Sequence, residues 1–286
     1  MPTIDWNTAI LYARLVKIAE DVQPASEYSA QNKADILALG YTFLQTLYGN
    51  ELATEVSPHT GETVTYGFLG VSTAGELVAI LRGTDTVLEW MHDAAFLMLP
   101  NPIHSGAGMT EDGFTAIYKS LRTDRNLQST SATASIGAYV HAGRANTVTV
   151  AGHSLGGALA TLLTLDVALN TECRQPVVYT YASPRAGDHF FAGSFNATIP
   201  QSYRIHNRSD LVPCLPPFIP LPYEHTNTSV ELVSPMNAIQ ANIGCAHHLT
   251  TYLWLMDRML GGNSYAVDAD CRGSAYPGPA ATTARP

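Results

Sequence analysis

The stretch TVTVAGHSLGGALA, residues 147–160, decides the fold of this chain. Its first five residues, 147–151, are β-branched or apolar, which is typical of a strand buried on both faces. Residues 152–156 then form the pattern G-x-S-x-G, in which a serine occupies a tight turn from a strand into a helix. Small neighbours let such a turn bend sharply and bring the hydroxyl into the open. The stretch therefore predicts a strand–turn–helix unit with Ser154 as a nucleophile.

Helices and strands are expected to alternate on both sides of this unit. Residues 155–169 are apolar nearly all round, so this helix should be buried against a sheet. Further strands are expected at residues 63–71, 76–81, 177–181, 203–206 and 229–233, and helices at 8–22, 33–48, 114–121, 131–142 and 249–260. This order predicts an α/β fold with a mostly parallel central sheet flanked by helices.

The length and composition indicate one domain. A chain of 286 residues that is 46% hydrophobic can bury one large core, and we expect it to occupy residues 1–271. Residues 272–286 are rich in Ala, Pro, Thr and Gly and are expected to be a disordered tail.

The charge and hydropathy of the chain exclude several classes of partner. The net charge is −9 with scattered acidic residues, which argues against nucleic acid. No apolar run approaches eighteen residues, so no membrane span is expected. The first twenty residues lack the basic-then-apolar order of a signal peptide, so we expect a cytoplasmic protein, or a secreted one if the chain is already processed. Nothing in the sequence indicates an oligomeric state.

Four cysteines are widely spaced and form no C-x-x-C pair; they are Cys173, Cys214, Cys245 and Cys271. We expect free or isolated buried thiols, because no export signal is visible. A metal site built from Cys245, His247 and His248 is an alternative, but tetrahedral ligand spacing is missing. No metal or cofactor is therefore expected.

A serine nucleophile needs an imidazole to take its proton and a carboxylate to orient that imidazole. On the fold that the turn predicts, the chain order is serine, acid, histidine. Asp210 follows the strand expected at residues 203–206 and fits the acid. Asp188 also follows a strand and is the second candidate, whereas Asp166 lies within the apolar helix.

Three histidines follow Asp210 and are candidates for the base. His225 precedes the expected edge strand and is interpreted as structural. His247 and His248 are adjacent at a transition from loop to helix, where one ring can reach the serine while the other packs or is solvated. His153, inside the turn, is interpreted as a structural neighbour of the nucleophile.

An oxyanion hole needs two donors aimed at one developing charge. The amide of Leu155 is one, and the loop after the strand at residues 76–81 supplies Thr84 as the other. The alternative for Thr84 is the cap of a following helix. Residues 91–112 are apolar but broken by Pro and Gly, which is typical of a mobile cover, an acyl-chain lining or a packed loop.

Several of these motifs occur together in the order seen in one family. They are Arg82-Gly83-Thr84 with Glu89-Trp90, Gly113-Phe114 with Tyr118, the turn at residues 152–157, Ser183-Pro184-Arg185, residues 210–213, Tyr223 with His225, and residues 247–252. Residues 60–256 thereby resemble the class 3 lipases, α/β-hydrolases that include secreted fungal triacylglycerol lipases. If the base-bearing motif has the form H-x-L-x-x-Y, the resemblance implies His247 as the base. If it has the spacing H-L-x-Y of the fungal branch, the resemblance implies His248. It also implies a lid within residues 85–108.

These observations predict a carboxylic ester hydrolase of the α/β-hydrolase fold. The expected reaction is lipase-like hydrolysis of triacylglycerol or other acyl esters, at a lipid–water interface, through an acyl-enzyme. Ser154, Asp210 and His247 would be the triad, with His248 as the alternative base, and Thr84 and Leu155 would form the oxyanion hole. Alternatives are a short-chain, feruloyl or phospholipid esterase, and a non-catalytic binding protein on the same fold.

Overall fold

The computed structural model describes residues 3–51, 62–83, 96–218, 222–226 and 229–278. Its centre is a seven-stranded sheet in the order β1-β2-β3-β6-β7-β9-β11. The strands are β1 (Tyr41–Asn50), β2 (Thr63–Ser72), β3 (Glu76–Leu81), β6 (Thr147–His153), β7 (Val177–Tyr181), β9 (Ser202–Asn207) and β11 (Ser229–Leu232). The first three strands pair antiparallel, and the pairs from β3 to β11 are parallel. The predicted mostly parallel central sheet is thus confirmed.

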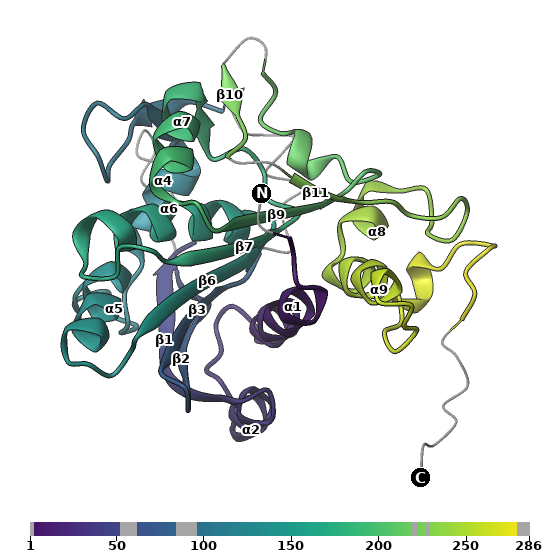
Figure 1. Ribbon diagram of the computed structural model, residues 1–286, viewed down its shortest axis with the longest axis horizontal. Helices are drawn as coiled ribbons and strands as arrows, with labels where there is room; N and C mark the ends of the chain where they lie inside the picture. Colours follow the sequence, from purple (N-terminus) through teal and green to yellow (C-terminus); the bar gives the residue numbers. More distant parts are fainter. Residues whose placement is uncertain (1–2, 52–61, 84–95, 219–221, 227–228, 279–286) are drawn as a thin grey trace.

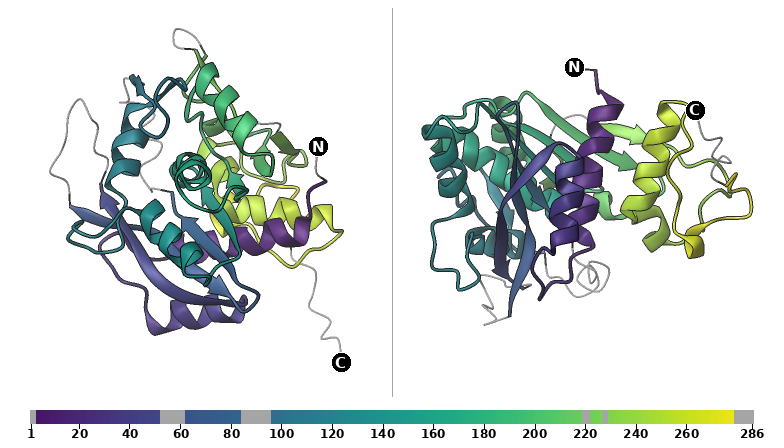
Figure 2. Two further views of the ribbon diagram at one scale, coloured as in Figure 1. Left: turned by 60° about the vertical axis from the view of Figure 1, so that its left-hand side comes forward. Right: turned by 90° about the horizontal axis from the view of Figure 1, so that it is seen from below.

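Helices cover both faces of this sheet (Figure 1). One face carries α1 (Trp6–Glu20), α2 (Ala30–Ala38), α8 (Ile243–His247) and α9 (Leu249–Met259), which share one hydrophobic core. The other face carries α4 (Asp112–Ser120), α5 (Ala132–His141), α6 (Leu155–Asn170) and α7 (His189–Thr198), which share a second core. Helix α1 packs against α9, so the first and the last of these helices lie side by side on one face (Figure 2).

A second, antiparallel sheet lies beside α7. It has the order β10-β8-β5-β4 and is made of β4 (Met98–Pro100), β5 (Met109–Glu111), β8 (Gly187–Asp188) and β10 (Tyr223–Glu224). Strands of two or three residues depend on partners far away in the chain, so local sequence patterns do not reveal them. Part of the stretch in which a lid was expected, residues 98–100, belongs to this sheet, and residues 85–95 lie outside the described residues.

The helix expected over residues 33–48 was wrong in its second half. Helix α2 ends at Ala38, and β1 begins at Tyr41. Gly40 lies between them with φ of 91°, a left-handed conformation that ends a helix at little cost. From Tyr41 onward, aromatic and β-branched residues pair along the whole length of β2, which favours a strand over the helix that their spacing suggested.

The expectation of free cysteines was wrong for one pair. Cys245 and Cys271 form a disulfide, because the fold brings their Cα atoms within 5.1 Å across 26 residues of chain. Cys173 and Cys214 are free, as expected.

The segment after this disulfide packs against the domain as far as it is described. The Gly273 amide donates to the Ala238 carbonyl at 2.9 Å, and the Tyr276 ring lies 5.5 Å from the Trp254 ring. Residues 272–278 therefore do not match the disordered tail that was expected, whereas residues 279–286 lie outside the described residues. The extent of the single domain stays a prediction. Among the helices described, none is both long and apolar enough to cross a bilayer.

Candidate active site

The turn between β6 and α6 places Ser154 in a strained conformation. Ser154 has φ of 56° and ψ of −129°, which non-glycine residues rarely adopt. The flanking glycines are required by space: a Cβ on Gly152 would lie 2.1 Å from the Gly156 carbonyl oxygen, and one on Gly156 would lie 2.4 Å from the Leu81 carbonyl oxygen. The G-x-S-x-G pattern therefore lets α6 start directly against the ends of β3 and β6.

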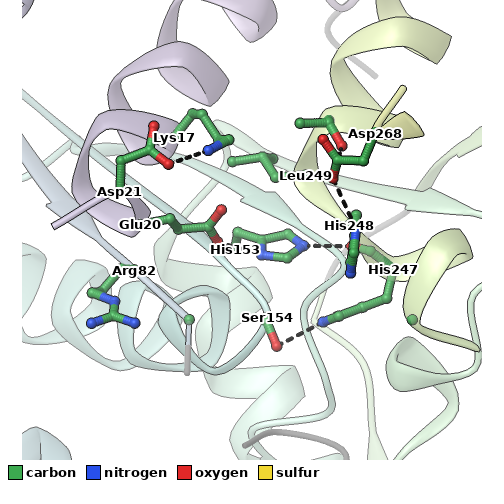
Figure 3. A pocket seen from close by; sticks show the side chains of 13 residues that line it. Lys17, Glu20, Asp21, Arg82, His153, Ser154, His247, His248, Leu249 and Asp268 are labelled. Atoms are coloured by element: carbon green, nitrogen blue, oxygen red, sulfur yellow. Dashed lines mark hydrogen bonds and ion pairs between the residues drawn. The ribbon is translucent and has the colours of Figure 1, made fainter. Parts of the chain in front are cut away.

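His247 lies between Ser154 and Asp210. Its Nε2 atom is 2.8 Å from Ser154 Oγ, and its Nδ1 atom is 2.8 Å from Asp210 Oδ2 (Figure 3 shows the contact with Ser154). An ionised carboxylate can only accept, so Nδ1 carries the proton and Nε2 offers its lone pair to the hydroxyl. The structure thus joins three segments that are far apart in the sequence: the turn after β6, the loop after β9 and the end of α8.

Tyr252 holds the carboxylate of Asp210 in place. Its hydroxyl donates to Asp210 Oδ2 at 2.8 Å and accepts the Asn207 amide at 2.9 Å, and Tyr252 is fully buried. The other carboxylate oxygen accepts the Val212 amide at 3.0 Å. From the sequence, Tyr252 is predicted only as part of a motif. Its position five residues after His247, on the next helix, is the feature that could have indicated its contact with Asp210.

Burial lowers the pKa of His247 below its ordinary value of 6.5. The hydrogen bond and the charge of Asp210 raise this pKa, while the neighbouring His153 lowers it further. The imidazole is therefore neutral at pH 7, which is the form that can accept a proton.

The two other histidines that were candidates have different partners. The Nδ1 atom of His248 is 3.0 Å from Asp268 Oδ2, so this ring is bound by a second carboxylate. His225 donates through Nε2 to the Pro213 carbonyl at 2.5 Å. Burial, with the nearby charge of Arg204, lowers the pKa of His225 to about 3. His225 therefore stays neutral, as the interpretation of a structural histidine requires.

The two other carboxylates that were considered serve the fold. Asp188 caps α7, where its Oδ1 atom accepts the Phe191 amide at 2.8 Å. Asp166 accepts the Tyr118 hydroxyl and the Thr133 hydroxyl, the latter at 2.6 Å. Neither is joined to the triad geometry, so Asp210 is the carboxylate that the fold brings to His247.

One of the two expected oxyanion donors lies within the described residues. Leu155 is the first residue of α6, where backbone amides have no partner inside the helix and the helix dipole favours negative charge. Thr84 lies outside the described residues. The preceding residue, Gly83, passes so close to Ser154 that a Cβ there would lie 3.0 Å from Ser154 Cβ.

Ser154 faces a cavity of about 360 Å³, which His247 also lines. Ser154 itself is only 2% exposed, so the hydroxyl is more enclosed than the sequence suggested. Charged side chains from α1, from the end of β3 and from the segment after α9 line the same cavity; they are Lys17, Glu20, Asp21, Arg82 and Asp268 (Figure 3).

His153 and Glu20 form a second imidazole–carboxylate pair beside the first. The Nδ1 atom of His153 is 2.7 Å from Glu20 Oε1, and its Nε2 atom is 2.8 Å from the backbone oxygen of His247 (Figure 3). Glu20 is not predictable as a site residue from the sequence, since nothing local in α1 connects it with a turn 133 residues later.

A metal site at residues 245–248 does not fit this arrangement, because the Cys245 sulfur is bonded to Cys271. In the part of the chain that the structure describes, no three His, Cys, Asp or Glu side chains are grouped to hold a metal ion.

Comparisons with known proteins agree with this geometry. Residues 78–219 match the family described as Lipase (class 3). Phospholipase A1-II 7 of Oryza sativa subsp. indica is 30% identical over 216 residues, which cover 64% of this chain and 52% of that protein. The secreted mono- and diacylglycerol lipase A of Penicillium cyclopium is 30% identical over 191 residues, 63% of this chain and 59% of the lipase.

A solved structure shows the same fold. The nonglycosylated LIP2 lipase of Yarrowia lipolytica superposes with a TM-score of 0.63 at 20% identity, over 85% of this chain and 84% of the lipase. The chain spans about half the length of the plant relatives it matches. The motif order, the α/β-hydrolase fold and the family match lead to one conclusion: the chain contains a segment of the class 3 lipase family at residues 78–219, within an α/β-hydrolase fold.

Proposed function

We propose that this chain is a serine hydrolase that cleaves the acyl esters of lipids through an acyl-enzyme. The observation that carries the proposal is the unbroken series of contacts from Ser154 through His247 to Asp210, with both distances at 2.8 Å. A strained turn, a neutral imidazole and a carboxylate with fixed hydrogen bonds are the parts that nucleophilic acyl transfer needs.

The proposed reaction begins when Ser154 Oγ attacks the acyl carbon and its proton passes to His247 Nε2. Asp210 stabilises the imidazolium that results. The oxyanion of the tetrahedral intermediate would be held by the amides of Leu155 and Thr84. The imidazolium then gives its proton to the departing alcohol, and water, deprotonated by the same imidazole, hydrolyses the acyl-enzyme. No step needs a metal or a cofactor.

A lipid with a polar head group is the substrate class that the cavity favours. Lys17 and Arg82 bring positive charge, and Glu20, Asp21 and Asp268 bring negative charge, to the space beside Ser154, with Lys17 paired to Asp21. Charged groups that line the cavity beside Ser154 suit a phosphate or sugar head group better than a third acyl chain. The rice phospholipase A1 and the Penicillium mono- and diacylglycerol lipase, both similar to this chain, support a glycerolipid.

The experiment is a rate series on the purified chain. We would compare the hydrolysis rates of phosphatidylcholine, monoacylglycerol, diacylglycerol and triacylglycerol, each presented once as a dispersion and once as an emulsion. Soluble p-nitrophenyl esters of increasing acyl length would be measured beside them. We expect hydrolysis that Ser154→Ala reduces by about 10⁶-fold without changing the circular dichroism spectrum. An active Ser154→Ala enzyme would refute the proposal, and a preference for triacylglycerol would refute the assigned head group.

A further inference from the structure

In the pair formed by Glu20 and His153, the carboxylate comes from outside the segment that matches the family, whereas His153 lies within it. Glu20 is the last residue of α1, and the match begins at residue 78. The side chain of His153 is 6% exposed and that of Glu20 is 21% exposed, at the edge of the cavity. The His153 ring lies 4.7 Å from the His247 ring, centre to centre, so the two imidazoles are in contact.

The two hydrogen bonds of His153 require both of its nitrogens to carry protons. The backbone oxygen of His247 can only accept, so Nε2 must donate to it. The carboxylate of Glu20 also only accepts when it is ionised, so Nδ1 must donate as well. Only the imidazolium satisfies both contacts at once. A neutral ring keeps one of them and loses the other.

The electrostatic surroundings favour this charged pair. Burial acts to lower the pKa of His153, but the charge and the hydrogen bond of Glu20 outweigh it, so the pKa is raised. Burial acts to raise the pKa of Glu20, but the charge and the hydrogen bond of His153, together with the charges of Lys17 and His247, outweigh it, so this pKa is lowered. Both directions describe an imidazolium beside a carboxylate.

We infer that Glu20 and His153 are positioning residues for the general base, because protonated His153 donates a hydrogen bond to the backbone carbonyl of His247, and Glu20 keeps His153 protonated. The inference rests on the proposed function, in which His247 is that base. A general base must keep its nitrogen within hydrogen-bond reach of the serine hydroxyl, and loss of a backbone anchor moves the whole ring.

Other charged and titratable groups face His153 from each element packed around it. They are Lys17 from α1, Arg82 at the end of β3, Asp210 after β9, His247 from α8 and Tyr252 from α9. Lys17 is itself paired with Asp21, and Asp210 also binds His247 and Tyr252. Glu20 is the carboxylate in direct contact with His153, so its removal should change the charge of that ring most.

The inference predicts a pH profile of kcat/KM with two limbs. On the acidic side, activity falls as His247 gains a proton. On the alkaline side, activity falls as the pH rises through the raised pKa of His153, because the deprotonated ring loses one contact. Glu20→Gln keeps the shape and an acceptor for Nδ1 but removes the charge. The alkaline limb should then move to lower pH by about 1 to 3 units, the range for losing an adjacent opposite charge.

The test measures kcat/KM with a soluble p-nitrophenyl ester from pH 5 to 10 for the native enzyme and for Glu20→Gln. The matched control is Glu172→Gln, because Glu172 Oε1 contacts His141 Nδ1 at the same 2.7 Å on the surface, just after the end of α6 that lies opposite Ser154. The control should leave the profile unchanged. His153→Asn should lower the rate at every pH and remove the alkaline limb altogether.

Two results would overturn the inference. One is a Glu20→Gln profile that is lower by the same factor at every pH, which is the signature of a merely structural role. The other is a neutral His153 at pH 7, read from the 15N shifts of the native enzyme labelled on histidine; this measurement stands even where Glu20→Gln does not fold. If the native enzyme hydrolyses no ester, the proposed function fails instead, while the protonation of His153 is still read from the same spectra.

Discussion

Replacing Asp210 by Asn tests the triad most specifically, because the change replaces one carboxylate oxygen by an NH₂ group and leaves the shape of the side chain. In the native enzyme Oδ1 accepts the Val212 amide, and Oδ2 accepts from both His247 Nδ1 and the Tyr252 hydroxyl. An asparagine places its oxygen on one side and its NH₂ group on the other. The question is which side faces His247.

The hydrogen bonds around Asp210 decide that orientation. With the NH₂ group toward Val212, two donors would face each other in a buried site, at a cost of about 1–3 kcal/mol. With the NH₂ group toward His247 and Tyr252, the Val212 contact is kept and the NH₂ hydrogens go to His247 Nδ1 and the tyrosine oxygen, so only the Tyr252 hydroxyl proton loses its acceptor, whereas the first orientation leaves both the Val212 amide and the NH₂ group unpaired. The second orientation is thus favoured by about 5- to 150-fold. In it Nδ1 must accept, so the proton sits on Nε2 and the imidazole cannot take one from Ser154.

The expected loss in kcat is about 10⁴-fold, the size found when the same exchange puts a histidine in the wrong tautomer in a serine protease. That factor corresponds to about 5.4 kcal/mol of transition-state stabilisation. The assay is kcat/KM for a p-nitrophenyl ester, with the His247 tautomer read from 15N shifts. Glu172→Gln is the control, because Glu172 binds the exposed His141 at 2.7 Å on the surface, and it should change kcat/KM by less than about threefold. Equal losses in the two variants, or more than a tenth of native activity in Asp210→Asn, would refute the reasoning.

Three further predictions follow from single contacts. Tyr252→Phe leaves the buried Asn207 amide without its acceptor, so the free energy of unfolding in urea should fall by about 2 kcal/mol, and a change below about 0.5 kcal/mol would contradict that cost. Because burial lowers the pKa of His247 and the base must be neutral, the acidic midpoint of kcat/KM should lie below pH 6.5, and activity should fall as the pH drops through that lower pKa. An acidic midpoint at or above 6.5 would show that the pKa of the His247 imidazole is not lowered. Replacing both Cys245 and Cys271 by Ser opens a loop of 26 residues and should lower stability by about 3.5 kcal/mol, measured by the urea midpoint, and an unshifted midpoint would contradict this.

Local patterns in the sequence were enough to predict the centre of the molecule. The β-branched run, the two glycines and the apolar helix are contiguous in residues 147–169, so the strand, turn and helix could be inferred together. The chain order of serine, acid and histidine then pointed to Asp210 and to the pair His247 and His248. The choice within that pair stayed open in the sequence, because adjacent residues differ only in the direction in which their side chains point. The backbone at the end of α8 sets that direction.

Features that depend on partners far away in the chain could not be predicted from the sequence. The strand β1 was taken for a helix, because its pairing with β2 is not visible in its own residues. The disulfide joins Cys245 to a residue after α9, and only the packing of α8 and α9 brings the two together. Glu20 was missed for the same reason: it reaches the site because α1 packs across the sheet against α9, which no pattern within α1 indicates.

Covalent labelling tests the central claim most directly. The purified chain would be treated with a fluorophosphonate at pH 7, and the modified peptide would be identified by mass spectrometry. Our account predicts one adduct, on Ser154, whose formation slows by orders of magnitude in His247→Ala and is little changed in His248→Ala. No adduct, an adduct on another residue, or a stronger dependence on His248 than on His247 would contradict the account.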